Sequence, residues 1–290
     1  MKTLITIKLN MEATSALGTI IMLFTAAFTY KGFKEQLFMD EYIFHVDPIL
    51  KQQDYKRLVS SGFLHANWIH FGFNMIALVS FATSLEILLG VGKLTLLYFI
   101  SLLGGSLLSL YIHKMHGDYR ALGASGAVSG VAFAFIILFP EKDISFIFLP
   151  EVGIRAWVFG LFFIIVSIFG IKSKEGNIGH DAHLGGAIVG GLLALVLKPA
   201  DVEINWLIVG ALLLPTIAFL ILIVRNPAVL MIDKYWGESV ENLRNPKPKA
   251  PRFANKESEL NFLLDKIAKK GIGSLSRQER KRLEELKNEL

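Results

Sequence analysis

The chain contains no cysteine among its 290 residues, and charged residues make up only 19% of it. The first absence excludes disulfides, thiolate nucleophiles and cysteine-ligated metal sites. The second sets the chain apart from soluble domains, in which about 25% of the residues are charged. Hydrophobic residues make up 53% of the chain, and they are concentrated in long blocks. This pattern is typical of a polytopic membrane protein.

Seven apolar blocks are candidates for helices that cross a bilayer, which takes about 20 apolar residues. They lie at approximately residues 12–30, 68–90, 94–113, 124–139, 153–171, 181–198 and 205–225. The start of the chain resembles a signal peptide, but no small-residue cleavage site follows the first block, so we interpret that block as a retained span. The expected fold class is an all-α polytopic membrane protein.

The stretch between the first two blocks, residues 31–66, is much longer than the other connections. It mixes aromatic and aliphatic side chains with charged ones, which favours a loop that is packed on the protein and partly embedded in the membrane. Connections of this length are often functional.

After Arg225 the chain is polar and carries most of the net charge of +5. A linker with several prolines over residues 245–255 precedes a predicted helical hairpin over residues 256–290. The apolar face of its first helix is predicted to be Leu260, Leu263, Leu264 and Ile267. Residues 276–279, Ser-Arg-Gln-Glu, have the form of a capping box that begins the second helix. A solubilising or partner-docking tail is favoured, and its charge suits anionic headgroups better than nucleic acid.

Ser125 lies between small residues in the run Gly-Ala-Ser-Gly at 123–126, where the fourth block begins. A helix from Ser125 to Phe139 would be about 22 Å long, shorter than the roughly 30 Å hydrocarbon core of a bilayer. The serine hydroxyl would then lie below one membrane surface, where an unpaired hydroxyl is costly. Its partner is either its own helix backbone, in a structural interpretation, or a catalytic base.

Further polar groups lie where other even-numbered blocks begin, and such blocks begin at the same membrane face. His70 and Asn74 are four residues apart on one helix face, where they can bind one oxygen together or form an ordinary interhelical bond. His183 is followed by a stripe of small residues that includes Gly186 and Gly190.

The fourth block has a matching stripe in Gly126 and Gly130. Such stripes allow two helix backbones to approach closely. Close packing of the fourth and sixth blocks would bring Ser125 near His183, which is the nucleophile and base arrangement of covalent catalysis.

Together these residues resemble the signature of the rhomboid family of intramembrane serine proteases. The family patterns His-x-x-x-Asn, Gly-x-Ser-Gly and Ala-His-x-x-Gly correspond to residues 70–74, 123–126 and 182–186. Further agreement is found at Arg57, Phe63, Leu64, His65, Glu86, Gly90, Gly92 and Lys93. The resemblance extends over about residues 12–198, in order and with appropriate spacing.

The resemblance implies that Ser125 is the nucleophile and that His183 is the general base, without a carboxylate. It also implies that His70, Asn74 and the backbone N–H of Ser125 stabilise the oxyanion. Structural support is expected from Gly123, Gly126, Gly186, Gly190, Arg57 and Glu86. No metal or other cofactor is implied. The implied substrates are transmembrane helices of other membrane proteins, which enter from the lipid bilayer.

The implied domain organisation has three parts. A protease core of six transmembrane helices is expected over residues 1–200, a seventh transmembrane helix over 201–226 and a soluble tail over 227–290. The tail resembles short helical extensions of some bacterial members, so we expect the bacterial cell membrane as the location.

Three positions depart from the family pattern or invite another interpretation. Ser129 stands where many members carry an aromatic residue stacked on the catalytic histidine, so either the imidazole is held less rigidly or the Ser129 hydroxyl bonds it. Lys56 precedes Arg57 where tryptophan is common. Asp181, two residues before His183, is interpreted as a helix cap and not as a member of a triad.

Competing classes of protein stay open at this point. The main one is a catalytically inactive rhomboid-like protein that binds transmembrane clients. A metal protein would use the histidines 65, 70, 180 and 183, but the chain has no His-Glu-x-x-His motif. A Gly-x-Gly-Asp aspartyl site is absent too, and a transporter would need more intramembrane charge than Glu86 supplies.

Overall fold

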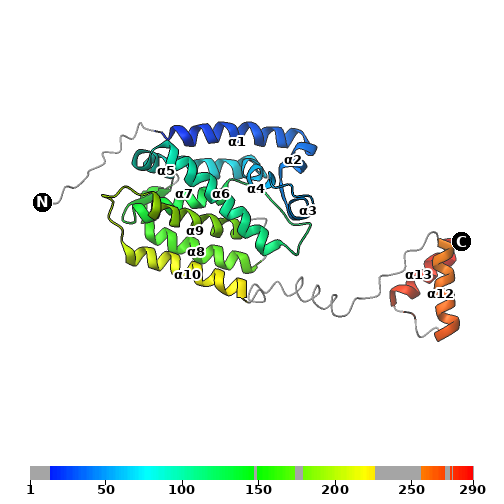
Figure 1. The fold of residues 1–290 in the computed structure, drawn as a ribbon. Helices are drawn as coiled ribbons and strands as arrows, with labels where there is room; N and C mark the ends of the chain where they lie inside the picture. The colour runs from blue at the N-terminus through cyan, green and yellow to red at the C-terminus, as the bar shows by residue number, and fades with distance from the viewer. Residues whose placement is uncertain are drawn as a thin grey trace. The chain divides into compact units, whose positions relative to one another are not determined.

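The computed structural model describes residues 14–146, 149–173, 179–225, 256–271, 275 and 277–289. The chain divides into two compact units, Met1–Ile232 and Asp233–Leu290. The described part of the first unit is a bundle of long helices, and that of the second is a helical hairpin (Figure 1).

Long helices in the first unit coincide with all seven predicted apolar blocks to within a few residues. They are α1 (Ala16–Lys34), α5 (Trp68–Leu89), α6 (Val91–His113), α7 (Ser125–Leu138), α8 (Ala156–Ser173), α9 (His180–Leu197) and α10 (Trp206–Arg225). By length and composition, α1, α5, α6, α9 and α10 are able to cross a membrane, while α7 and α8 are shorter apolar helices over the described residues. The predicted all-α polytopic fold is confirmed.

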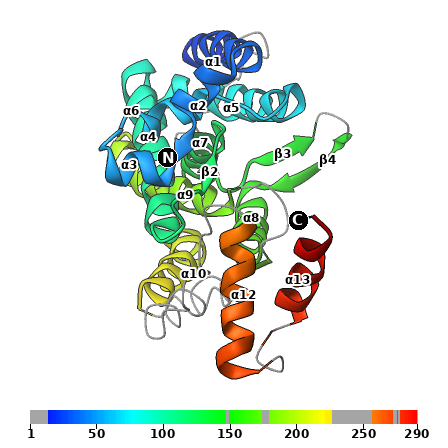
Figure 2. The same cartoon turned by 90° about the vertical axis from the view of Figure 1, so that its right-hand side faces the viewer.

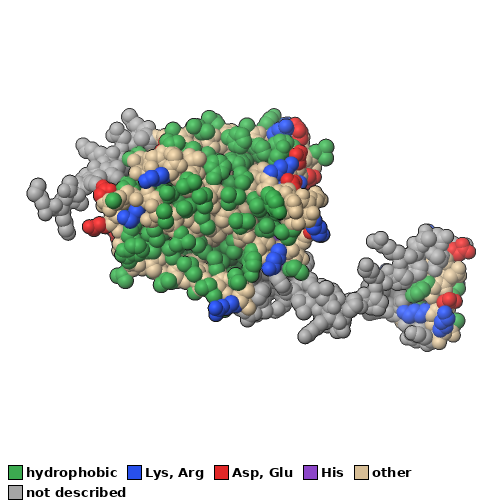
Figure 3. Space-filling view, viewed as in Figure 1, with side chains coloured by type: hydrophobic (Ala, Val, Ile, Leu, Met, Phe, Trp, Pro, Cys, Tyr) green, Lys and Arg blue, Asp and Glu red, His purple; other side chains and the backbone are tan. Residues whose placement is uncertain are grey.

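The face of the bundle drawn in Figure 3 is apolar over its middle, and charged side chains gather there towards the two ends of the helices. Large apolar side chains that are more than half exposed include Leu23, Phe24, Phe162, Phe169, Val196, Leu207 and Leu214. Soluble monomers rarely expose an apolar surface of this extent. The chain is therefore an integral, multi-pass membrane protein, and this apolar surface faces lipid.

The shortest of these helices, α7, lies at the centre of the bundle. Every residue from Gly126 to Leu138 is buried, against α5, α6 and α9. Its 14 residues rise only about 21 Å, so its first residue does not reach the membrane surface if its last residue does. The helix begins at Ser125, as the sequence predicts.

Of the described helices, α7 and α9 make the most extensive contact, and glycine is what allows it. A Cβ added to Gly186 would collide with the carbonyl oxygen of Gly126, and one added to Gly190 would collide with that of Gly130. The two predicted stripes of small residues therefore do meet, backbone against backbone.

The long connection after α1 folds into short elements that pack on the bundle. These are α2 (Gln36–Tyr42), β1 (Phe44–His45), α3 (Val46–Lys51), α4 (Arg57–Ser60) and the 3-10 helix η1 (Ser61–Phe63). Phe44, Val46, Ile49 and Leu58 form a buried apolar cluster there. β1 pairs antiparallel with β2 (Arg120–Ala121), which ties this connection to the segment that precedes α7.

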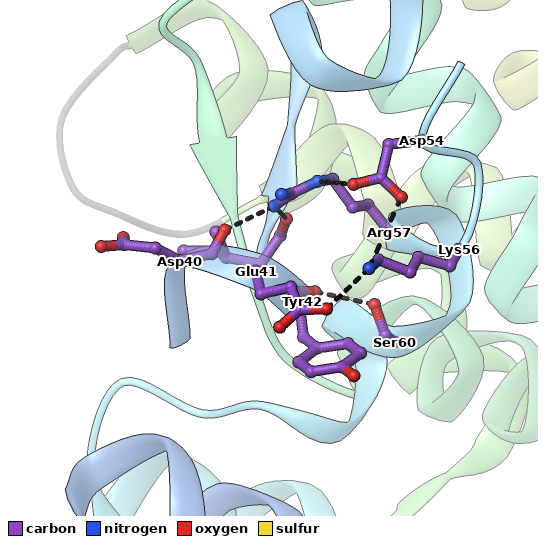
Figure 4. A network of polar contacts seen from close by, with 8 residues as sticks. Asp40, Glu41, Tyr42, Asp54, Lys56, Arg57 and Ser60 are labelled. Atoms are coloured by element: carbon purple, nitrogen blue, oxygen red, sulfur yellow. Dashed lines mark hydrogen bonds and ion pairs between the residues drawn. The ribbon is translucent and has the colours of Figure 1, made fainter. Parts of the chain in front are cut away.

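Arg57 holds the same connection together from inside (Figure 4). Its buried guanidinium donates to the carbonyl oxygens of Asp40 (2.6 Å) and Ile43 (2.9 Å) and to the carboxylate of Asp54 (2.8 Å). Arginine suits this position because its planar guanidinium has five N–H donors in a fixed geometry. Arg57 therefore has a structural place in the fold.

Lys56 lies on the outside of this connection and takes part in its packing in a different way. Its ammonium group is 2.9 Å from the Glu41 carboxylate and 5.0 Å from the centroid of the Tyr42 ring. The hydrogen bond between Lys56 and Glu41 raises the pKa of Lys56 and lowers that of Glu41. Lys56, which stands where tryptophan is common, thus contacts the aromatic ring of Tyr42.

Two smaller features are a β-hairpin in the first unit and the helical hairpin of the second. β3 (Asp143–Phe146) and β4 (Leu149–Arg155) form an antiparallel hairpin that stands out from the helices (Figure 2). In the second unit α12 (Lys256–Lys270) and α13 (Arg277–Glu289) enclose a core of their own, and its buried residues are Leu263, Leu275 and Leu286.

The predicted apolar face of the first tail helix needs one correction. Leu260 and Ile267 pack against the tail core, as predicted, but Leu264 is 47% exposed. At i+4 it lies at the edge of the narrow stripe that a two-helix contact can cover. The predicted capping box begins with Ser276, which lies outside the described residues.

Candidate active site

Ser125 stands at the N-terminus of α7, and the segment before it explains why the helix begins there. Gly123 has φ of +126°, a backbone conformation that residues with a side chain rarely adopt. Its N–H donates to the Ser61 carbonyl oxygen at 3.0 Å, which anchors the turn to η1. Ala124 is the N-cap residue and is fully buried, whereas Ser125 is half-buried. The turn therefore leaves Ser125 partly accessible.

A helix N-terminus suits the chemistry expected of Ser125. The first N–H groups of an α-helix have no carbonyl partner within the helix, and the helix dipole places partial positive charge there. An oxyanion formed on a carbonyl attacked by Ser125 would lie beside these groups.

His183 is the fourth residue of α9 and is half-buried. Its ring lies 6.1 Å, centroid to centroid, from the Phe163 ring of α8 and 5.7 Å from the His180 ring. A Cβ on Gly126 would lie 3.3 Å from the Ala182 carbonyl oxygen, so the first turns of α7 and α9 are in contact. The close packing of the glycine stripes thus extends up to the turns that carry Ser125 and His183.

The His183 imidazole has two candidate hydroxyl partners, Ser125 and Ser129. Within the part of the chain that the structure describes, no hydrogen bond joins the Ser125 hydroxyl to the His183 imidazole. Catalytic hydrogen bonds are often long before substrate binds. The Ser129 hydroxyl donates to the Ser125 carbonyl oxygen (2.7 Å), one turn back, and does not bond the imidazole. Phe163, from a different helix, is the aromatic neighbour of His183.

His70 and Asn74 lie on α5, beside the same turn. The Asn67 side chain caps α5 by accepting from the His70 N–H (2.8 Å), which sets the start of the helix. A Cβ built on Gly123 would be 2.8 Å from His70 Cε1 and 3.8 Å from the Ser125 hydroxyl oxygen. Gly123 therefore separates the imidazole from the serine, and a larger residue would not fit. Asn74 is buried and donates to the His70 carbonyl oxygen (2.9 Å), which uses one of its two amide hydrogens.

His65, fully buried, links α1 to the turn that presents Ser125. Thr29 donates its hydroxyl hydrogen to the Phe63 carbonyl oxygen (3.0 Å), so its oxygen accepts from Nδ1–H of His65 (3.1 Å). Nε2 of His65 then carries a lone pair and accepts from the Ala124 N–H (3.4 Å). Burial lowers the pKa of His65 to about 3, and the nearby His70 adds to the effect, so the imidazole is neutral.

Comparison with known families assigns the chain to one of them. The family described as Rhomboid domain matches residues 52–200, just over half of the chain. The chain belongs to the rhomboid family. Residues 252–289 match a second family, described as a family of unknown function (DUF6576), which covers both tail helices.

Individual rhomboid relatives are similar to about half of the chain. "Rhomboid protein 1, mitochondrial" of Saccharomyces cerevisiae is 37% identical over 159 residues, 52% of this chain and 46% of the yeast protein. "Rhomboid protease GluP" of Bacillus subtilis is 30% identical over 150 residues, 51% of this chain and 27% of the relative. "Rhomboid protease AarA" of Providencia stuartii is 30% identical over 156 residues, 49% and 56%. The chain thus spans about half or less of the length of most of these rhomboid relatives.

Not every predicted residue of this rhomboid lies at the site. Glu86 accepts from the backbone N–H groups of Ala16 (3.2 Å) and Leu17 (3.1 Å) and from the Ser15 hydroxyl, and so caps the N-terminus of α1. It follows His70 by 16 residues on α5, which places it about 24 Å away along the helix. Glu86 stabilises the contact between α1 and α5.

The histidines that a metal protein would have used do not form a ligand set. Among the described residues, no group of three or more His, Cys, Asp or Glu side chains is arranged to hold a metal ion. Both ring nitrogens of His65 are occupied by protein groups. From the sequence, His65 was expected only as a candidate metal ligand and as part of a motif. Its contact with Ala124 has no sequence signal, because Thr29, His65 and Ala124 lie on three separate segments.

The predicted cap role of Asp181 is wrong. The N-cap of α9 is Gly179, and Asp181 is the second residue of the helix. Its side chain is 5% exposed and points to α6, where it meets Ser109 and His113. A cap side chain must lie just before the helix to reach its free N–H groups, whereas Asp181 is already one residue inside it.

Proposed function

We propose that this rhomboid is an intramembrane serine endopeptidase in which Ser125 is the nucleophile and His183 the general base. The observation that carries the proposal is the contact between the first turns of α7 and α9, at glycines that permit no side chain between them. The relatives named as rhomboid proteases, GluP and AarA, support the same class of reaction.

The proposed reaction has two stages. The Ser125 hydroxyl oxygen attacks the carbonyl carbon of the scissile peptide while His183 accepts the hydroxyl proton. The tetrahedral intermediate collapses, the amine leaves with that proton, and an ester between Ser125 and the substrate remains. A water molecule then attacks the ester with His183 as base, which releases the carboxylic acid and restores Ser125.

The oxyanion in both stages requires donors that are in place beforehand. We assign this role to the Ser125 N–H, the His70 imidazole and the second amide hydrogen of Asn74. Each such donor is typically worth about 2.7–4 kcal/mol of the barrier in a site of this type. Gly123 leaves room for the His70 imidazole beside Ser125. Gly126, Gly186 and Gly190 allow the contact between α7 and α9 on which the pairing of Ser125 with His183 depends.

The proposed substrates are transmembrane helices, which enter laterally from the bilayer and unwind locally, since a helical peptide bond is shielded. The proposed domain organisation follows the sequence: core 1–200, seventh span 201–226 and soluble tail 227–290. Bacterial and mitochondrial relatives are both found, and we propose a bacterial cell membrane because of the tail.

The experiment combines a fluorophosphonate probe and a model transmembrane substrate with the purified full-length chain. We expect the wild type to be labelled and to cleave, and Ser125→Ala to do neither. His183→Ala is expected to lose at least about 10³-fold in cleavage rate. Ser80→Ala is the control, because Ser80 is exposed on α5 and its hydroxyl donates to the Ile76 carbonyl oxygen of its own helix (2.7 Å).

Two outcomes would contradict this assignment. Cleavage that survives Ser125→Ala would exclude Ser125 as the nucleophile. A wild type that binds a transmembrane peptide but neither cleaves it nor reacts with the probe would favour the catalytically inactive client-binding protein.

A further inference from the structure

A second polar cluster lies next to the catalytic turn and has no part in the reaction proposed above. Asp181, two residues before His183, is 4% exposed. Its Oδ2 accepts from the Ser109 hydroxyl (2.5 Å) and lies 3.2 Å from His113 Nε2. Ser109 and His113 are four residues apart on α6, so they present both donors on one face. A buried carboxylate requires such partners, because it is otherwise very costly.

The cluster is closed on its far side by the loop between α6 and α7. The Tyr119 ring stacks on the His113 ring, with 3.5 Å between centroids and 6° between planes. Tyr119 also packs against Phe44 of β1, and its carbonyl oxygen accepts from the Val46 N–H (3.2 Å). Burial raises the pKa of Tyr119, and the Asp181 charge raises it further, as expected if the phenol and the carboxylate are close. The long connection after α1 thus encloses this cluster.

Asp181 is directed away from His183. Two residues correspond to about 200° around a helix, so the two side chains leave α9 on opposite sides. Asp181 points to α6, and its described hydrogen bonds include none to the imidazole. Asp181 therefore does not act on His183 by direct contact, and a positional effect passes through the helix that carries both residues.

A polar contact of this kind matters for α9 because glycines make up much of the helix's contact with α7 and α6. On the α7 side Gly186 and Gly190 meet glycine backbone, and on the α6 side a Cβ on Gly185 would be 2.8 Å from the Gly104 carbonyl oxygen. Val189 of α9 packs on Gly104 of α6, but contacts of backbone against backbone offer little else to oppose rotation or sliding. A directional polar contact at one end of α9 supplies that resistance.

A small rotation of α9 would be enough to affect catalysis. The helix with its side chains has a radius of about 5–6 Å, so a turn of about 10° moves the His183 ring by about 1 Å. A misplacement of this size can lower a rate about 100-fold.

We propose that Asp181 is a positioning residue, which holds the first turn of α9 to Ser109 and His113 of α6 and so sets the place of His183 relative to Ser125. The inference rests on the proposed protease function. It assigns to this chain an Asp–Ser–His contact that acts through the helix and not on the reacting atoms.

The kinetic test uses the full-length chain with the variants Asp181→Ala, Asp181→Asn and Ser109→Ala. We expect Asp181→Ala to lower kcat and the rate of fluorophosphonate labelling by the same factor, about 10- to 100-fold, with KM unchanged. Asp181→Asn, whose amide oxygen can still accept from Ser109, should restore most of the rate. Ser109→Ala combined with Asp181→Ala should lose no more than Asp181→Ala alone. Asp201→Asn, a change at an exposed aspartate, is the control.

A second measurement does not depend on the protease function. Because the chain has no cysteine, Leu107→Cys on α6 and Val196→Cys on α9, both exposed, can carry spin labels for a distance measurement in nanodiscs. Asp181→Ala should shift or broaden the distance distribution, and Asp201→Asn should not. The proposal is overturned if the distribution stays unchanged, or if Asp181→Ala lowers the melting temperature while the labelling rate of the folded fraction stays at the wild-type value. A wild type that is not labelled would refute the protease function, and the spin-label result would still decide whether Asp181 places α9.

Discussion

At the scale of single residues, the candidate site includes side chains that stand out in the sequence and one whose role shows only in the structure. Ser125, His183, His70 and Asn74 stand out in the sequence because each is polar within or next to an apolar block. His65 does not stand out in this way, yet it supports the turn that presents the serine. Its support depends on a lone pair at Nε2, and therefore on the neutral form of the imidazole.

This dependence predicts a pH effect on stability. The pKa of His65 is about 3 in the folded chain against an ordinary value of 6.5, so the unfolded chain binds the proton more readily. Its contribution to stability is complete above about pH 6.5 and is lost as the pH falls towards 3. At pH 4.5 the expected loss is about 2–3 kcal/mol.

His65→Phe should make the unfolding free energy less dependent on pH between about 6.5 and 4.5, and chemical unfolding in detergent at several pH values would measure this. The variant should also label more slowly at pH 7.5, because Ala124 loses its acceptor. An unchanged pH slope in His65→Phe would show that the imidazole is not held neutral by burial.

At the scale of elements, the decisive contact is the glycine face between α7 and α9. It brings two helix N-termini together, and it leaves no room for a methyl group at Gly186 or Gly190. The same residue type at Gly72 of α5 meets nothing within 4 Å of an added Cβ. A side chain is therefore excluded by packing at Gly186 and Gly190 but has room at Gly72.

Gly186→Ala and Gly190→Ala are therefore expected to destabilise the chain by about 1–3 kcal/mol and to abolish most cleavage, since the helices must move apart. Gly72→Ala is the matched control and should be neutral or stabilising by up to about 1 kcal/mol, because alanine is the better helix former. Thermal unfolding and probe labelling of the three variants would measure this. If Gly186→Ala and Gly72→Ala behaved alike, the backbone contact would not be limiting.

At the scale of the whole molecule, the chain consists of two compact units with separate cores. The second unit has its own buried leucines, and none of the residues assigned to the reaction belongs to it. The catalytic proposal therefore concerns the first unit alone, while the tail matches a family of its own.

A chain that ends at Ile232 should therefore fold and be labelled by the fluorophosphonate at a rate within about threefold of the full chain, since parts with separate cores and no shared partners act additively. Side-by-side labelling of both chains in the same detergent would measure this. A truncated chain that is folded but unlabelled would indicate that the tail contributes to the site.

The apolar blocks determined the long helices, because a bilayer requires about 20 apolar residues per span and the chain shows where they lie. The polar residues within the blocks indicated the candidate site, since such residues are rarely placed there without a role. Local spacing also indicated that the glycine stripes match. These conclusions need only neighbouring residues along one segment.

Tertiary structure decided what depends on several segments at once. It turned Asp181 from an expected cap into a buried partner of α6, directed the Ser129 hydroxyl to its own backbone and placed Phe163 beside His183. It also joined Thr29, His65 and Ala124, which come from three segments. Residue order shows which side chains are polar, but the direction in which each one points is set by how the helices rotate against one another, and that is decided by packing.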